Sequence, residues 1–221
     1  MHRLRDLPRR QLLLAALVLF ALALPVGASV ARAMGDGYRA SNDDALLALR
    51  VHDMLDGRFP LVGQPSTAEQ YADTDPPHHP GPIQFYVFAP VVGLVGADVG
   101  MLVGAALVNG ASVLVAVWVV FRRAGPLVGL GAAVLFGLLA YAQGPAQLSD
   151  PVSSNMGGIP LLALAVLAWA VVVGDIGLLP MAALWFAWVF QQHLAVVAMA
   201  SGTAAWAGVG ENAPGPPCPA A

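Results

Sequence analysis

The chain contains 221 residues, of which 58% are hydrophobic and only 10% are charged, and its mean hydropathy is +0.71. Soluble domains contain about 25% charged residues, so this composition indicates an integral membrane protein and excludes a disordered chain. All ten cations are arginines and thirteen acids outnumber them, which gives a net charge of -3 and leaves no basic patch for nucleic acid. The single cysteine, Cys218, excludes an internal disulfide and matches no metal-binding spacing.

The N-terminal segment combines arginines with the first apolar run. Four arginines lie within residues 1–10, and the apolar run over residues 11–31 has about the 20 residues that a membrane-spanning helix needs. The positive-inside rule therefore predicts that residues 1–10 form a basic cytoplasmic N-terminus. The alternative is a signal peptide, because Ala31-Arg32-Ala33 resembles a cleavage site. Both interpretations place the polar loop that follows, residues 34–82, outside the cytoplasm.

Further apolar runs follow this loop. They cover residues 83–97, 99–121, 125–142, 158–173 and 176–199, and short polar or Gly/Pro breaks separate them. The run at residues 83–97 is short for a span, and the positive-inside rule places Arg122 and Arg123 in the cytoplasm. We therefore expect residues 83–97 to form a helix that lies in the membrane interface or re-enters it, and the remaining runs to cross.

These expectations define an all-α fold: a polytopic membrane helix bundle with about five transmembrane helices and interfacial helices in the first external loop. Residues 11–207 form the membrane domain. The tail over residues 208–221 is rich in Gly and Pro and is expected to be disordered.

This topology places the polar groups that lie in or beside apolar segments on the external side of the membrane. These groups are Asp43, Asp44, His78, His79, Asp150, Asn155, Gln192 and His193. An ionisable group in lipid costs about 2.5–3.5 kcal/mol on insertion scales, so such groups usually face a cavity or a partner. We therefore expect these side chains to converge on a site.

Asp43 and Asp44 precede a segment, residues 45–55, whose apolar residues recur at helical spacing before Gly57 ends it. Two carboxylates are thus expected in the first turn of an external amphipathic helix. Ser41 and Asp44 fit a capping box, and acids at a helix N-terminus stabilise it by about 0.3–1 kcal/mol, so capping is the structural interpretation. In the functional interpretation, one carboxylate binds a cation or orients a substrate while the other accepts a proton.

His78 and His79 lie in a rigid turn, because prolines flank them and Gly81 permits unusual backbone angles. Adjacent imidazoles point in different directions and form a poor metal pair alone, although one can join Asp43 or Asp44 around a divalent cation. The alternatives are a structural hydrogen bond at the membrane surface and a contact to phosphate or sugar.

Two further polar elements lie near the predicted external surface. Residues 147–155, which include Asp150 and Asn155, contain more hydrogen-bonding groups than a turn needs, although turn formation by their side chains is the structural alternative. Gln192 and His193 lie near the end of the last apolar run. We expect them either to form hydrogen bonds between helices or to line a polar cavity.

Together these motifs resemble the actinobacterial branch of the GT-C glycosyltransferases, polytopic enzymes that use polyprenyl-phosphate-linked sugars. The similar features are Asn42-Asp43-Asp44-Ala45, the turn His79-Pro80-Gly81-Pro82-Ile83, the polar loop from Ser149 to Asn155, and Gln191-Gln192-His193. The likeness covers residues 1 to about 200. Family members continue through further spans, so we expect the chain to be the N-terminal portion of such an enzyme, as a fragment, a frameshifted product or a degenerate copy.

The resemblance implies that a sugar is transferred from a polyprenyl-phosphate donor to a glycan, lipid or protein acceptor at the extracytoplasmic face of the cell membrane. It implies that Asp43 or Asp44 is the catalytic base. The candidate substrate-binding residues are Arg50, Arg58, His78, His79, Asp150, Asn155, Gln192 and His193. The alternative is a non-catalytic membrane protein or a transporter subunit, for which internal repeats and polar groups at mid-membrane would be expected.

Overall fold

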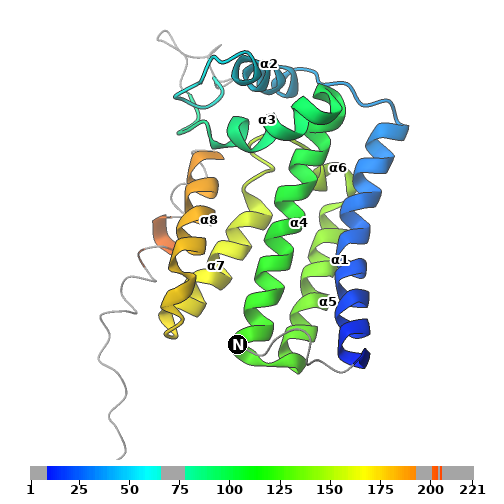
Figure 1. Cartoon of the computed structure of the whole chain (residues 1–221), viewed down its shortest axis with the longest axis vertical. Coiled ribbons are helices and arrows are strands. Elements are labelled where there is room, and N and C mark those ends of the chain that lie inside the picture. The colour runs from blue at the N-terminus through cyan, green and yellow to red at the C-terminus, as the bar shows by residue number, and fades with distance from the viewer. Residues whose placement is uncertain (1–8, 66–77, 193–200, 204, 206–221) are drawn as a thin grey trace, which may run out of the picture.

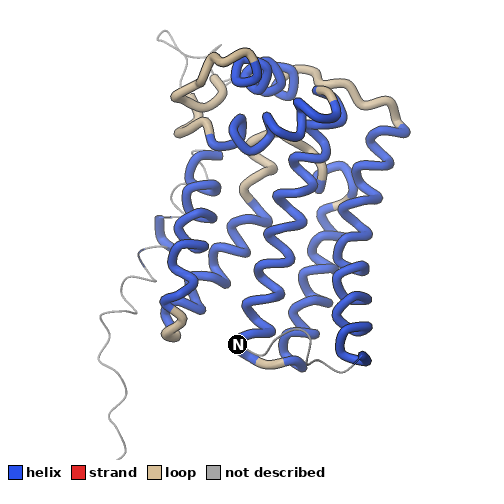
Figure 2. The backbone as a smooth tube through the Cα atoms, viewed as in Figure 1, coloured by secondary structure: helices blue, strands red, loops and turns tan. Residues whose placement is uncertain are grey.

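The computed structural model describes residues 9–65, 78–192, 201–203 and 205, and this part of the chain is all-helical, as predicted. The helices are α1 (Arg9–Gly35), α2 (Asp43–Leu55), α3 (Ile83–Val95), α4 (Ala97–Ala124), α5 (Pro126–Gln143), α6 (Pro145–Leu148), α7 (Gly158–Val172), the 3-10 helix η3 (Ile176–Leu178) and α8 (Leu179–Gln192). Figure 2 shows how short the loops between most of them are. The end of the last apolar run and the tail over residues 208–221 lie outside the described residues.

The long helices lie side by side and the first external loop crosses one end of them. Figure 1 shows α1, α4, α5, α7 and α8 along the long axis, with successive helices of this set running in opposite directions, and α2 and α3 across one end. α4 is central, because it contacts α1, α3, α5 and α7. The predicted interfacial helix over residues 83–97 thus corresponds to α3, which lies across the end of the bundle.

Two of these helices, α4 and α5, are long and apolar enough to cross a membrane, while α3, α7 and the segment Ile176–Gln192 are shorter apolar helices. α5 contacts α1, α4 and α6 but leaves large apolar side chains uncovered. Leu127, Val134 and Leu138 of α5 are 83%, 58% and 60% exposed. Contiguous exposed apolar surface of this kind is unusual in a water-soluble monomer and is expected on a lipid-facing helix.

Glycines bring α3 close to α4. A Cβ atom on Gly100 would lie 2.5 Å from the Cα of Val92, and one on Gly104 would lie 2.9 Å from the ring of Phe88. This Gly-x-x-x-Gly spacing lets two helices approach closely, as it does between membrane helices. Gly96, which has a φ of 85°, makes the sharp turn from α3 into α4 possible.

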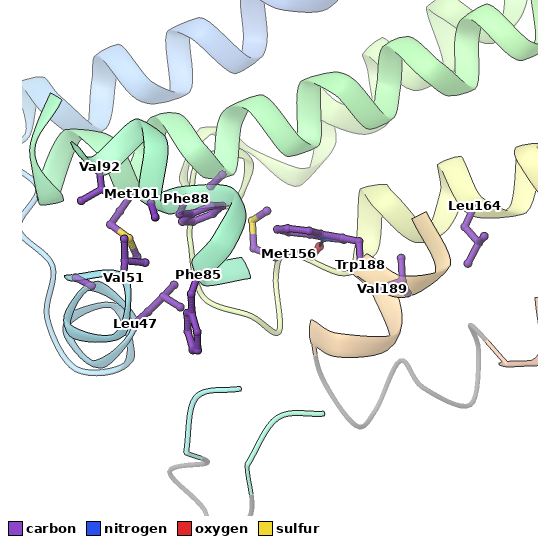
Figure 3. Packing of buried hydrophobic residues seen from close by; sticks show 13 residues of the cluster. Leu47, Val51, Phe85, Phe88, Val92, Met101, Met156, Leu164, Trp188 and Val189 are labelled. Carbon is purple, nitrogen blue, oxygen red and sulfur yellow. Dashed lines mark hydrogen bonds between the residues drawn. The ribbon is translucent and has the colours of Figure 1, made fainter. Parts of the chain in front are cut away.

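A buried apolar cluster fixes α2 on top of α3 and α4. Leu47 and Val51 of α2 pack with Phe85 and Phe88 of α3 and with Met101 of α4, and each is at most 1% exposed. Figure 3 shows the same cluster continuing through Met156 to Trp188 of α8. α2 is thereby held across the end of the bundle, with Arg50, His52 and Leu49 on its exposed side.

The opposite end of the bundle holds the arginine pair. Arg122 donates to Asp175 at 2.8 and 3.2 Å, and Arg123 donates to the carbonyl of Val173 at 2.7 Å. The α7–η3 turn therefore lies beside the C-terminal end of α4. The predicted topology assigns both segments to the cytoplasmic side.

Candidate functional site

A cavity of about 730 Å³ lies where α1, α2, α4 and the loop after α6 meet. Polar side chains from distant parts of the sequence line it: Ser29, Arg32, Asp36, Tyr38, Asp43, Asp44, Ser149 and Asp150. The acidic pair and Asp150 were both expected on the external side, and the structure brings them into one cavity.

The acidic pair stands in the first turn of α2, as predicted, but the predicted capping box is wrong. Asn42 is the residue before the helix, with a φ of 51°, and no described side chain caps α2. Asp44 instead accepts a hydrogen bond from the Tyr38 hydroxyl at 2.8 Å through Oδ2. The helix begins at Asp43, one residue later than the Ser41 pattern requires.

The cavity raises the pKa of Asp44. The largest cause is burial, while the hydrogen bond from Tyr38 acts in the opposite direction and the charges of Asp150 and Asp43 add to the increase. Burial and the same hydrogen bond raise the pKa of Tyr38, so its hydroxyl remains protonated as a donor. The Oδ1 atoms of Asp43 and Asp44 are buried and have no hydrogen-bond partner among the described residues. A carboxylate with a raised pKa and an open oxygen is suited to accept a proton.

Asp150 is held in one orientation by its own loop. Its Oδ1 atom accepts from the backbone N–H of Val152 at 2.9 Å, and its Oδ2 atom accepts from the Asn155 amide at 2.8 Å. Asp150 therefore both stabilises the turn, as one prediction had it, and lines the cavity, as the other had it. Asn155 does not line the cavity itself, but its hydrogen bond orients Asp150, which does.

Hydrogen bonds from the surrounding helices fix this loop. Asn109 of α4 donates to the carbonyl of Leu148 at 2.9 Å, and Gln84 of α3 donates to that of Pro151 at 2.6 Å. The Ser29 hydroxyl of α1 and the Ser149 hydroxyl lie 2.7 Å apart. Asn109 and Gln84 were not among the predicted residues, although an amide inside an apolar helix is a signal that such a contact exists.

The histidine turn lies beside the same loop, at its other end. The Nε2 atom of His79 lies 3.4 Å from the Ser153 hydroxyl, and the His79 backbone pairs with Gln64 at 2.9 Å. Gln191 of α8 packs against Gly81 and accepts from the backbone N–H of Ile83 at 3.1 Å. His79 is not among the described residues that line the cavity, and its imidazole contacts the loop at Ser153.

The other predicted binding residues lie away from the cavity or outside the described chain. Arg50 and Arg58 form ion pairs with Asp53 in the C-terminal half of α2, at 3.2 and 2.8 Å. His78 is exposed, and Gln192 is 1% exposed with no hydrogen-bond partner among the described residues. His193 falls outside the described residues.

The cation that does line the cavity, Arg32, was not predicted as a site residue. It lies in the last turn of α1 and makes a long ion pair with Asp36, at 3.7 Å, with 70% of its side chain exposed. Within the described residues no group of three or more His, Cys, Asp or Glu side chains is arranged to hold a metal ion. Among the described residues that line the cavity, Arg32 carries the positive charge, so it is the group that can bind an anion there.

No protein-family model, curated protein or solved structure matches the chain.

Proposed function

We propose that the chain is a GT-C-like membrane glycosyltransferase in which α1, α4, α5, α7 and the segment from η3 through α8 cross the membrane, with α2 and α3 at its extracytoplasmic surface. The length and apolar character of α4 and α5 support insertion. The position of Arg122 and Arg123 at the end opposite α2 supports the orientation, because arginines next to membrane helices stay in the cytoplasm.

The observation that carries the proposal is the convergence of Asp43, Asp44 and Asp150 in one cavity at this end of the bundle. Such a cavity can hold a sugar through hydrogen bonds from the sugar hydroxyls to carboxylate oxygens. It also lies next to the apolar part of the bundle, so a lipid-linked donor can reach it without leaving the bilayer.

In the proposed reaction, Asp44 accepts the proton from an acceptor hydroxyl while that oxygen attacks the anomeric carbon of the sugar. The bond from this carbon to the lipid phosphate breaks, the configuration inverts, and the phosphate leaves with the electron pair. Arg32 stabilises the charge that develops on the phosphate. Arg50 and Arg58 do not line the cavity and pair with Asp53 instead. Asp43 and Asp150 orient the sugar.

The test replaces Asp43 and Asp44 singly by Asn, which keeps the shape of the side chain and removes its basicity. Membranes containing each variant are supplied with a polyprenyl-phosphate-linked radioactive sugar, and its transfer is counted. Loss of a general base lowers the rate by about 10²–10⁴-fold, and we expect this for Asp44→Asn. Asp56→Asn is the matched control, because Asp56 follows the same helix and pairs with Arg58 at the surface. Transfer that survives both Asp43→Asn and Asp44→Asn would show that the proposed mechanism is wrong.

A further inference from the structure

A second hollow, of about 570 Å³, lies between α1 and α5, on the side of the bundle. We call it the α1–α5 groove. Its floor contains the buried residues Ala133, Ala140 and Leu148, and its rim contains exposed apolar side chains such as Leu138. The small side chains of Ala133 and Ala140 leave room between the two helices. The groove is apolar and open to the lipid-facing side.

One face of α1 and the residue directly after it line first the groove and then the cavity that holds Asp43, Asp44 and Asp150, which we call the carboxylate cavity. Ala21, Leu24 and Ala28 line the groove, and Arg32 and Asp36 line the cavity. Successive members of this series are three or four residues apart, so they lie on one face of the helix. At about 1.5 Å per residue, the part of α1 that lines the groove is about 10 Å long. This length fits within the hydrocarbon part of one leaflet, which is about 15 Å thick.

The opposite wall makes the same transition from apolar to polar. Tyr141 and Leu148 line the groove, whereas Gly144 and Ser149, which follow them closely in the chain, line the cavity. The two hollows are therefore adjacent on both walls. Arg32 is the first charged residue of the α1 series after the apolar part, so it stands at the junction.

We propose that the α1–α5 groove binds the hydrocarbon chain of a lipid phosphate, with the phosphate at Arg32 and the rest of the head group in the carboxylate cavity. This inference rests on the proposed function for the nature of the head group, and it adds the place where the lipid chain is bound. An apolar groove that ends at a cation and then at hydrogen-bonding carboxylates complements a lipid phosphate along its whole length.

The test measures lipid binding and does not require sugar transfer. The purified full chain in detergent is irradiated with a photoactivatable farnesyl phosphate, and the labelled residues are identified by mass spectrometry. We expect labels on α1 and α5 at the groove. Ala28→Trp and Val134→Trp fill the groove from exposed positions that need no repacking, and we expect each to lower labelling roughly tenfold, the effect of about 1.4 kcal/mol.

Three controls test the specificity of the labelling for the groove, for the phosphate and for the lipid chain. Ala183→Trp, on an exposed position of α8, is expected to leave labelling unchanged. Arg32→Gln is expected to lower labelling by the phosphate probe while leaving labelling by the corresponding farnesol probe intact. Unlabelled undecaprenyl phosphate should compete with the probe at much lower concentration than phosphatidylglycerol.

Equal labelling of the Trp variants and the unchanged chain would overturn the inference, as would equal competition by phosphatidylglycerol, which would mean an ordinary boundary lipid. These results are separate from those of the Asp44 test. If the groove is labelled but Asp43→Asn and Asp44→Asn both retain full transfer, the proposed reaction is rejected and the lipid-binding groove is supported. If Asp44→Asn abolishes transfer but the groove is not labelled, the proposed reaction is supported and the proposed lipid-binding groove is rejected.

Discussion

Asp44 receives one hydrogen bond, from Tyr38 to Oδ2, while its Oδ1 atom is buried without a partner among the described residues. A buried acceptor without a donor costs free energy, so its position in a cavity favours a ligand that donates a hydrogen bond there. An acceptor hydroxyl of a sugar or lipid is such a donor. The geometry distinguishes Asp44, which is held by Tyr38, from its neighbour Asp43.

The surroundings of Asp44 predict opposite pH effects for two substitutions. A base works only when it is deprotonated, so a raised pKa of Asp44 means that transfer is lost as the pH falls through a value above that of an ordinary carboxyl group. Tyr38→Phe removes the hydrogen bond that lowers the pKa of Asp44, so the acidic limb of the pH–rate profile should move to higher pH. Asp150→Asn removes a charge that raises this pKa, so the limb should move to lower pH. The profile of kcat/KM against pH measures both shifts, and a common direction for the two variants would contradict this account.

At the scale of the helices, α2 carries the acidic pair but depends on α3 and α4 for its position. Leu47 and Val51 are its buried contacts, and Phe85, Phe88 and Met101 form the surface that receives them. Burial of these apolar side chains, rather than the intrinsic helix propensity of a 13-residue segment, stabilises α2. The catalytic proposal therefore predicts that apolar residues far from the carboxylates affect transfer.

Leu47→Ala tests this dependence. The side chain is 1% exposed, so its truncation leaves a cavity and should lower the free energy of unfolding by about 2–5 kcal/mol, as in other cores. Transfer should fall with it, because α2 loosens. The control is Leu49→Ala in the same helix, where the side chain is 62% exposed and the change should stay within about 0.5 kcal/mol. Denaturant titration in detergent gives both values, and equal effects of the two variants would show that α2 is not held by this cluster.

At the scale of the whole molecule, polar groups concentrate at the two ends and apolar surface lies between them. The carboxylate cavity and α2 occupy one end, and the ion pair of Arg122 with Asp175 occupies the other. The side chain of Asp175 is held by this arginine, which lowers the pKa of its carboxyl group. The Gly174-Asp175 turn has no cation of its own, but the fold supplies one from α4.

Accessibility of single cysteines tests the orientation in the membrane. In a Cys218→Ser background, Ser41→Cys should react with a membrane-impermeant maleimide on intact cells, because Ser41 lines the cavity that the proposed orientation places outside. Ala124→Cys, at the C-terminal end of α4, should react only after permeabilisation. Each position is exposed or at a helix end, so the fold should tolerate both changes. Reaction of both cysteines on intact cells would reject the orientation, and reaction of Ser41→Cys from both sides would favour a transporter.

Local patterns in the sequence determined where the helices begin and end. Long apolar runs and the Gly and Pro breaks between them act over a few residues, so α3, α4, α5 and α7 appear within a few residues of their predicted bounds. The carboxylates of the first loop and Asp150 were expected on one side because helix direction alternates along the chain. That argument predicts that they lie at the same end of the bundle, and it does not say which of them share a cavity.

Only the tertiary structure decided which polar groups share the cavity. The capping box failed because α2 begins at Asp43, one residue later than the Ser41 pattern requires, and Asp44 accepts from Tyr38 instead. The separation of His79, Arg50 and Arg58 from the cavity depends on how α2 and α3 lie across the bundle. The role of Arg32 and the α1–α5 groove depend on the rotation of α1 about its own axis. The groove depends equally on the rotation of α5, whose sequence is apolar on every side and contains no amphipathic signal for that rotation. The packing of small residues between helices sets it.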